Sequence, residues 1–122
     1  MGWFSKKEKK PEASFTQIAD EDFAEKVLQA DKPVMLFLWS DTCPFCKKMA
    51  PNALELLRRH PDDLLGYHAR ATDAPRIAQA VQLRGVPATA FFLKGKMVAF
   101  APGFQLVDAL DEVVQKILGA AQ

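Results

Sequence analysis

The sequence predicts an α/β protein with a mixed central β-sheet flanked by helices on both faces. Segments with strand-like and helix-like apolar spacing alternate along the chain in the order β-α-β-α-β-α-β-β-α. The run from Val34 to Trp39 is apolar without alternation, which is typical of a strand that helices cover on both sides. Two later apolar runs meet at Lys94-Gly95, where we expect a hairpin, and this hairpin makes the sheet mixed.

The first predicted strand, from Phe15 to Ile18, is short and suits an edge of the sheet. A helix should follow, with Asp20 as its N-cap, and it should end before Lys32-Pro33 because a proline interrupts helical hydrogen bonding. The apolar residues that recur at helical spacing in this segment are Phe23, Val27 and Leu28.

The second helix is predicted to begin near Cys43, after a polar loop that follows the buried strand. Pro44 suits its first turn, where a missing N–H leaves no hydrogen bond unmade. Its apolar stripe consists of Met49, Ala53, Leu56 and Leu57. A strand over Leu64 to Ala69 comes next, and then a short helix that Asp73 should cap. Pro75 lies in the first turn of that helix, with Ile77 and Val81 facing inward.

The strands of the predicted hairpin cover Ala88 to Leu93 and Lys96 to Phe100. The last segment has the spacing of an amphipathic helix. We expect its buried face to hold Leu106, Leu110, Val113, Val114, Ile117 and Leu118.

Composition narrows the classes of protein that this chain can belong to. Its 122 residues, 49% apolar and 25% charged, are typical of one globular domain. A net charge of +1 argues against a nucleic-acid-binding protein, which would need a strong basic field. Two cysteines are too few for a disulfide-dense scaffold.

The basic charge is concentrated at the N-terminus. Residues 1–14 hold four lysines and two glutamates, so we predict a flexible basic tail there and a folded domain over residues 15–122. We expect this tail to be solvated; the alternative is weak contact of Trp3 and Phe4, beside these lysines, with an anionic membrane surface. No apolar run has the length of a signal-peptide core or a membrane span, so a cytoplasmic location is expected.

The segment Cys43-Pro44-Phe45-Cys46 carries the chemistry that the sequence predicts. The reactive form of cysteine is the thiolate, which unpaired N–H groups and the partial positive charge at a helix N-terminus favour. Cys43 is expected at that position. It would attack a substrate disulfide as the nucleophile, and the more buried Cys46, one turn later, would resolve the mixed disulfide.

Three alternatives for this pair are a structural disulfide, half of a zinc site, and inert core thiols. A disulfide that closes so short a loop constrains the unfolded chain little. A closed zinc site needs four ligands, and only His60 and His68 are available, at no standard spacing. We therefore expect a redox pair and no metal.

Two stretches resemble the thioredoxin family. The segment from Trp39 to Pro51 resembles the family's active-site stretch, in which a Trp precedes W-C-G-P-C-K and a helix proline follows. Arg84-Gly-Val-Pro-Ala-Thr89 is similar to the family's R-G-I-P-T loop. The resemblance runs without a gap from about Phe15 to Leu118, and further matches at family spacing are Phe92, Gly95 and Gly103.

The resemblance implies a thioredoxin fold in which Pro87 is cis and lies against the cysteines. It implies that the backbone of Val86 pairs with an extended substrate segment and that Trp39 packs beneath the site. The redox-active disulfide would be the only redox group, with no bound cofactor. Protein disulfides would be the substrates, an NADPH-dependent flavoprotein reductase the recycling partner, and the protein a monomer. The expected substrate-contacting residues are Trp39, Thr42, Pro44, Phe45, Val86 and Pro87.

The sequence also departs from the family pattern near the cysteines. Phe37 stands where the family has a buried Asp, which is thought to help move the proton of the second cysteine. His68 stands where the family has the Lys beside that Asp. Proton transfer at Cys46 would then use water or His68, and His68 is the candidate residue, although a core histidine is the favoured interpretation of this position. Thr42 replaces the Trp before the first cysteine. The Pro-Phe dipeptide is similar to the Pro-Tyr of glutaredoxins, which predicts a reduction potential less negative than that of thioredoxin.

These observations predict a thiol–disulfide oxidoreductase that reduces or exchanges protein disulfides, with a role in electron transport and cell redox homeostasis. Two alternatives remain open at this point: a non-catalytic binding module with the same fold, and a reductant dedicated to one partner.

Overall fold

The computed structural model describes residues 14–120. Its elements in chain order are β2 (Phe15–Gln17), α1 (Asp20–Asp22), η1 (Phe23–Leu28), β3 (Val34–Trp39), α2 (Pro44–Arg59), β4 (Leu65–Arg70), η2 (Ala71–Asp73), α3 (Pro75–Ala80), β5 (Ala88–Leu93), β6 (Lys96–Pro102) and α4 (Val107–Ala120). The predicted basic tail, and the alternative of membrane contact, fall on residues 1–14, of which 1–13 lie outside the described residues.

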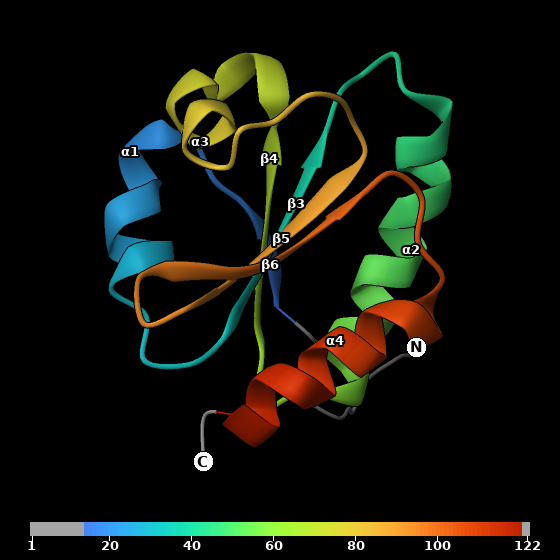
Figure 1. The fold of residues 1–122 in the computed structure, drawn as a ribbon. Coiled ribbons are helices and arrows are strands. Elements are labelled where there is room, and N and C mark those ends of the chain that lie inside the picture. The colour runs from blue at the N-terminus through green and yellow to red at the C-terminus, as the bar shows by residue number, and fades with distance from the viewer. Residues whose placement is uncertain (1–13, 121–122) are drawn as a thin grey trace, which may run out of the picture.

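Five strands form one mixed sheet in the order β2-β4-β3-β5-β6. β2 and β3 both pair with β4 in parallel, whereas β5 runs antiparallel to β3, and β6 antiparallel to β5. Helices α2 and α4 cover one face of the sheet, and α1 and α3 cover the other (Figure 1). The predicted fold class and the predicted order of helices and strands along the chain are confirmed, as is the edge position of the first strand.

The central strand β3 explains why its sequence shows no alternation. Met35 and Phe37 belong to the core beneath α2 and α4, while Leu36 and Leu38 belong to the core on the opposite face. All four side chains are at most 3% exposed. Burial on both faces removes the selection for polar residues at every second position.

The first helical segment differs from the prediction. Ala19, not Asp20, is the N-cap, and one short α-turn passes into the π-helix η1. The Asp20 carboxylate instead accepts hydrogen bonds from the backbone N–H groups of Arg76 (3.0 Å) and Ile77 (2.9 Å) at the start of α3. Asp20 therefore caps a helix more than fifty residues away in the sequence, because the fold brings α1 and α3 together.

Asp73 was expected to cap α3, and this expectation is wrong. Ala74 is the N-cap of α3, and Asp73 belongs to the preceding 3₁₀ turn, where its carboxylate pairs with Arg70. A second difference concerns Leu106, which precedes α4 and is 66% exposed rather than buried. The other predicted positions of that helix are buried or partly buried against the core beneath α2 and α4.

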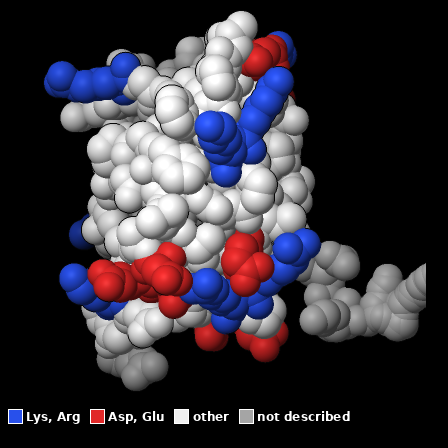
Figure 2. Space-filling model, turned by 90° about the vertical axis from the view of Figure 1, so that its right-hand side faces the viewer, with Lys and Arg blue, Asp and Glu red and all other residues white. Residues whose placement is uncertain are grey.

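Charged side chains join the C-terminal part of α2 to α4. Arg59 pairs with Glu55 on its own helix and with Asp108 and Asp111 of α4. His60, the C-cap of α2, hydrogen-bonds to Asp111, and this bond is the main cause of the lowered pKa of the Asp111 carboxyl. Figure 2 shows the side of the molecule that carries α2, with a band of mixed charges toward one end and a largely uncharged surface above it.

Candidate redox site

The two cysteines lie where the central strand passes into α2. β3 ends at Trp39, a short loop follows, and Cys43 is the N-cap of α2 with extended backbone angles (φ −105°, ψ 103°). Pro44 occupies the first turn, as the sequence predicted. Cys43 and Cys46 form a disulfide, with their Cα atoms 5.2 Å apart. The helical turn between them therefore holds both sulfurs within bonding distance.

The environments of the two sulfurs differ. The backbone N–H of Cys46 donates a hydrogen bond of 3.1 Å to Sγ of Cys43. Cys43 is partly exposed, whereas Cys46 is 4% exposed and belongs to the core. In the reduced protein, the helix N-terminus and this N–H donor favour a thiolate on Cys43, and solvent or a substrate can reach it. Cys46 is sheltered from direct attack by another molecule.

The charges around the disulfide are partly neutralised. The Asp41 carboxylate, in the loop before Cys43, forms an ion pair with the Arg70 guanidinium, which also pairs with Asp73. The hydrogen bonds that the guanidinium donates to these two carboxylates raise the pKa of Arg70 above its ordinary value. On α2, the ammonium group of Lys48 lies 5.4 Å from the centre of the Phe45 ring. Because Asp41 is paired, its charge opposes the Cys43 thiolate less than an unpaired carboxylate would.

A second loop supplies the cis proline that the family resemblance implied. The Val86–Pro87 peptide bond is cis, and Pro87 is buried. The backbone N–H of Gly103 donates a hydrogen bond of 2.8 Å to the carbonyl oxygen of Pro87, which joins this loop to the end of β6. Val86 and Cys43 both pack against the core beneath α2 and α4. A hollow of about 620 Å³ borders Val86, Pro87 and Gly103.

Two exposed aromatic rings lie against each other at a tilt, beside the disulfide. Phe45, between the two cysteines, is 56% exposed, and Phe104, after β6, is 40% exposed. Their ring centroids are 6.3 Å apart. Sequence reasoning singled out Phe45 but missed Phe104, because nothing local connects a loop aromatic to a motif almost sixty residues earlier. The signal available was the family-spaced Gly103 directly before it, whose φ of +74° forms the turn.

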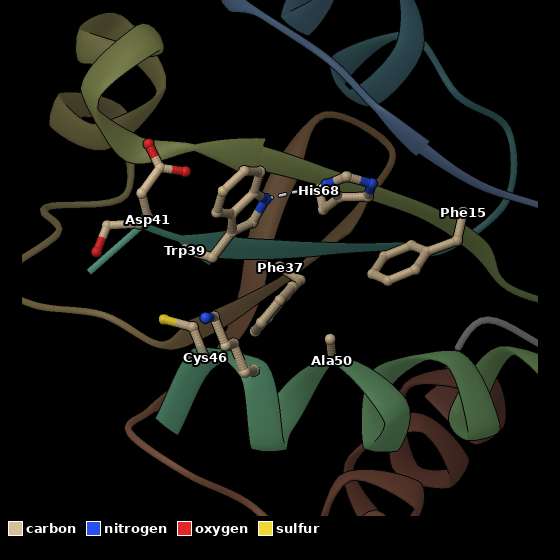
Figure 3. Close-up of a pocket in the computed structure, with 9 residues that line it drawn as sticks. Phe15, Phe37, Trp39, Asp41, Cys46, Ala50 and His68 are labelled. Atoms are coloured by element: carbon tan, nitrogen blue, oxygen red, sulfur yellow. Dashed lines mark hydrogen bonds between the residues drawn. The ribbon is translucent and has the colours of Figure 1, made fainter. Parts of the chain in front are cut away.

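A largely apolar cavity of about 370 Å³ borders Cys46 (Figure 3). The sheet and α2 both contribute to it. Its lining residues are Phe15, Phe37, Trp39, Ser40, Asp41, Cys46, Lys47, Ala50 and His68. The structure therefore brings Cys46 together with the three positions that the sequence analysis singled out beneath the site, namely Phe37, Trp39 and His68.

His68 is held in one tautomer inside this cavity. The indole N–H of Trp39 donates a hydrogen bond of 3.0 Å to Nδ1 of His68 (Figure 3). The Phe15 ring meets the imidazole edge-on, with centroids 4.7 Å apart. Because an indole nitrogen can only donate, the neutral imidazole must carry its proton on Nε2. Burial lowers the pKa of His68, so neutral imidazole is favoured, and neither ring nitrogen offers a free lone pair in this arrangement.

The two histidines considered for a zinc site have other partners. His68 bonds to Trp39 in the cavity, and His60 bonds to Asp111 at the far end of α2. Within residues 14–120, no three or more His, Cys, Asp or Glu side chains are grouped so as to hold a metal ion.

Over the same residues, no helix is both long and apolar enough to cross a membrane.

Fold and site together define a class of protein: an α/β domain with a dithiol pair at a helix N-terminus. Comparison with known proteins gives the family. The family model described as Thioredoxin matches residues 14–116, and the chain belongs to the thioredoxin family. The Cys43–Cys46 pair is the redox-active disulfide of a thiol–disulfide oxidoreductase, and the family acts on protein disulfides. These findings favour catalysis over the non-catalytic binding module.

Similar proteins are thioredoxins from several sources. The chain is 28% identical over 99 residues to the chloroplastic M-type thioredoxin of Spinacia oleracea, covering 78% of this chain and 55% of the spinach protein. It is 24% identical over 102 residues to thioredoxin 1 of a Nostoc species, covering 84% of this chain and 95% of that protein.

The fold has a solved counterpart. The crystal structure of the Malassezia sympodialis thioredoxin Mala s 13 superposes with a TM-score of 0.79 at 24% identity, covering 89% of this chain and 95% of that one. At this identity, the likeness supports the fold alone.

Proposed function

We propose that this protein reduces disulfides in polypeptide substrates, with Cys43 as the nucleophile and Cys46 as the resolving thiol. The observation that carries the proposal is the difference between the two sulfurs. Cys43 is partly exposed and accepts a hydrogen bond from a backbone N–H, whereas Cys46 is buried. A nucleophile has to be reached by its substrate, and a resolving thiol has only to reach its neighbour.

The reaction then has two exchanges. The Cys43 thiolate attacks one sulfur of the substrate disulfide; a mixed disulfide forms, and the other substrate sulfur leaves as a thiolate. Cys46 loses its proton, and its thiolate attacks Sγ of Cys43. The second substrate sulfur leaves, the Cys43–Cys46 disulfide forms, and the two released thiolates take up protons from solvent. The substrate gains two electrons, and the protein loses two.

The surface around Cys43 suits an extended segment of a partner. We place the substrate backbone along Val86, beside the buried Pro87, since an extended segment can pair with such a loop by strand addition. The exposed rings of Phe45 and Phe104 offer an apolar contact for a side chain next to the substrate cysteine. Thr42 and Pro44 are exposed at the rim, and Trp39 lies behind the disulfide.

The remaining assignments rest on the family resemblance. An NADPH-dependent flavoprotein reductase would return the disulfide to the dithiol, and the protein would act as a monomer. The cytoplasm, where thiols are kept reduced, is the compartment that we propose for this reduction. Thr42 stands where the family has a Trp, so the surface beside Cys43 lacks that aromatic ring. The exposed rings of Phe45 and Phe104 supply a different apolar surface there. This difference supports a second candidate function, a reductant with one dedicated partner.

Reduction of insulin with dithiothreitol as the electron donor tests the proposal. The wild-type protein should accelerate precipitation of the reduced B chain, and Cys43→Ser should remove the acceleration. Cys46→Ser should accumulate a mixed disulfide with the substrate, whereas Cys43→Ser, the matched control, should accumulate none. An unchanged rate for Cys43→Ser would show that the assigned nucleophile is wrong. Partners trapped from a cell extract on Cys46→Ser separate a general reductant, which gives many, from a dedicated one.

A further inference from the structure

Thr89 is a buried polar residue that the fold leaves without a hydrogen bond. Its side chain is fully buried, at 0% exposure, and among residues 14–120 it is the one polar or charged residue in the buried class. Its Oγ1 has no hydrogen-bond partner. An unpartnered hydroxyl destabilises a folded protein, so this position calls for an explanation in a core otherwise built from apolar side chains.

The sheet register places Thr89 on the face of the sheet that Phe37 and Cys46 also occupy. Thr89 lies on β5 directly across from Phe37 of β3, and side chains of such a cross-strand pair lie on the same face of a sheet. Phe37 and Cys46 belong to the same core cluster and line the same cavity, where Figure 3 shows them between β3 and the first turn of α2. The Thr89 hydroxyl is therefore on the α2 side of the sheet, one strand away from Phe37.

The polar side chains that line the cavity together with Cys46 have partners or are open to solvent. The Asp41 carboxylate pairs with Arg70, itself bound to Asp73. Nδ1 of His68 accepts from Trp39. Lys47 is exposed and Ser40 is partly exposed, so water competes for both. The N–H of Cys46 itself points to Sγ of Cys43. β3 lines the cavity with the apolar ring of Phe37 and with Trp39, whose indole N–H is already bonded to His68.

We propose that the Thr89 hydroxyl donates a hydrogen bond to the Cys46 thiolate that forms when the Cys43–Cys46 disulfide is open. This proposal rests on the resolving role proposed for Cys46. In the oxidised protein, Sγ of Cys46 is bonded to Cys43 and uncharged, and the hydroxyl is unpartnered. Once the disulfide is reduced and Cys46 loses its proton, the released sulfur carries a negative charge, and a buried donor that reaches it stabilises that charge.

The hydroxyl stabilises the charge and does not act as a base. A neutral threonine hydroxyl is too weak a base to take the proton of a thiol. The proton of the Cys46 thiol therefore passes to water through the cavity that Cys46 lines. The thiolate, held by Oγ1–H, then attacks Sγ of Cys43 in the mixed disulfide. The Cys43–Cys46 bond forms, the bond from Cys43 to the substrate breaks, and the hydroxyl is left unpartnered again.

Titration of the reduced full-length protein tests this inference directly. The Thr89→Val variant keeps the volume and removes the donor, and Thr89→Ser keeps the donor. The pKa of Cys46 is measured from the NMR shift of its Cβ. We expect Thr89→Val to raise this pKa by about one to two units, because the variant loses a charge-assisted hydrogen bond. Thr89→Ser should stay near the wild-type value. Resolution of a mixed disulfide preformed on Cys43 should slow about three- to tenfold in Thr89→Val at pH 7, because the smaller fraction of thiolate is partly offset by its greater nucleophilicity.

Two results would overturn the inference: an unchanged Cys46 pKa in Thr89→Val, or a Thr89→Ser variant that behaves like Thr89→Val. Thermal unfolding adds a readout that does not depend on activity. Thr89→Val should stabilise the oxidised protein, where the hydroxyl is unpartnered, more than the reduced protein at high pH. The insulin assay with Cys43→Ser tests the proposed function, and the Cys46 pKa in Thr89→Val tests this inference. A protein that does not reduce insulin, but whose Cys46 pKa rises in Thr89→Val, would contradict the proposed function and leave the hydrogen bond from Thr89 supported.

Discussion

The indole N–H of Trp39 donates a hydrogen bond of 3.0 Å to Nδ1 of His68 on the neighbouring strand. This contact fixes the wall of the cavity behind Cys46, since both residues line it. It also changes the role open to His68. A histidine that already accepts a hydrogen bond at Nδ1 and carries its proton on Nε2 has to break the contact with Trp39 before it can take a proton.

Protonation of His68 should therefore reduce stability in mildly acidic solution. Burial lowers its pKa in the folded protein below the ordinary value of 6.5, so the unfolded chain binds the proton more tightly. The contribution to stability is fully present above pH 6.5 and is lost as the pH falls through the folded pKa. Urea unfolding measured across this range should show the decline.

The non-titrating variant His68→Gln isolates this effect, because its amide oxygen can still accept from Trp39. The decline attributable to His68 should be absent in it. Trp39 fluorescence, recorded in a Trp3→Phe background to remove the other tryptophan, should change over the same pH range in the parent and stay constant in His68→Gln. A parallel decline in both proteins would assign the pH dependence to other groups, such as Asp111.

The dipeptide between the cysteines predicts a reduction potential less negative than the roughly −270 mV of thioredoxin, toward the about −200 to −230 mV of glutaredoxins. Equilibration with glutathione buffers, followed by alkylation of free thiols, measures it. The double variant Pro44→Gly, Phe45→Pro restores the family dipeptide and should make the potential more negative. A wild-type reduction potential equal to that of thioredoxin, or more negative, would contradict the prediction made from the dipeptide.

If the ring pair Phe45–Phe104 contacts protein substrates, removing one ring should weaken their binding and leave the rate of thiol–disulfide exchange unchanged. Phe104→Ala should raise the KM for a protein disulfide roughly three- to tenfold, as truncation of an exposed aromatic contact does at interfaces. The rate with a small aliphatic disulfide should stay unchanged, since that substrate is too small to reach across the pair. Val98→Ala removes a comparably exposed apolar side chain on β6 and serves as the control. An equal effect on both substrates would point to a disturbed redox site instead.

The fold and the cysteine site could be predicted because their signals are local. An uninterrupted apolar run marked β3, and the spacing of Cys43 and Cys46 beside Pro44 marked a helix N-terminus. Phe104, Thr89 and the His68–Trp39 contact could not be predicted in the same way. Each depends on which strands and loops become neighbours, and the register of β3 against β4 and β5 determines that.

Asp20 shows the same limit for capping. Its position before an apolar periodic segment predicted a cap for the helix that follows it, and a side-chain carboxylate binds whichever free N–H groups come within reach. In the folded protein these belong to Arg76 and Ile77. Local rules therefore identified a capping residue correctly and assigned it to the wrong helix.

Removal of this carboxylate should weaken the contact between α1 and α3. Asp20→Ala leaves two N–H groups at the start of α3 without their acceptor, and we expect a loss of about 0.5–2 kcal/mol in the free energy of unfolding. Asp20→Asn keeps an acceptor and should lose less. Glu21→Ala, at the exposed neighbouring position, is the control and should change stability little. Urea unfolding of the three variants measures these differences. A full loss in Glu21→Ala, with Asp20→Ala unchanged, would mean that α3 does not depend on Asp20.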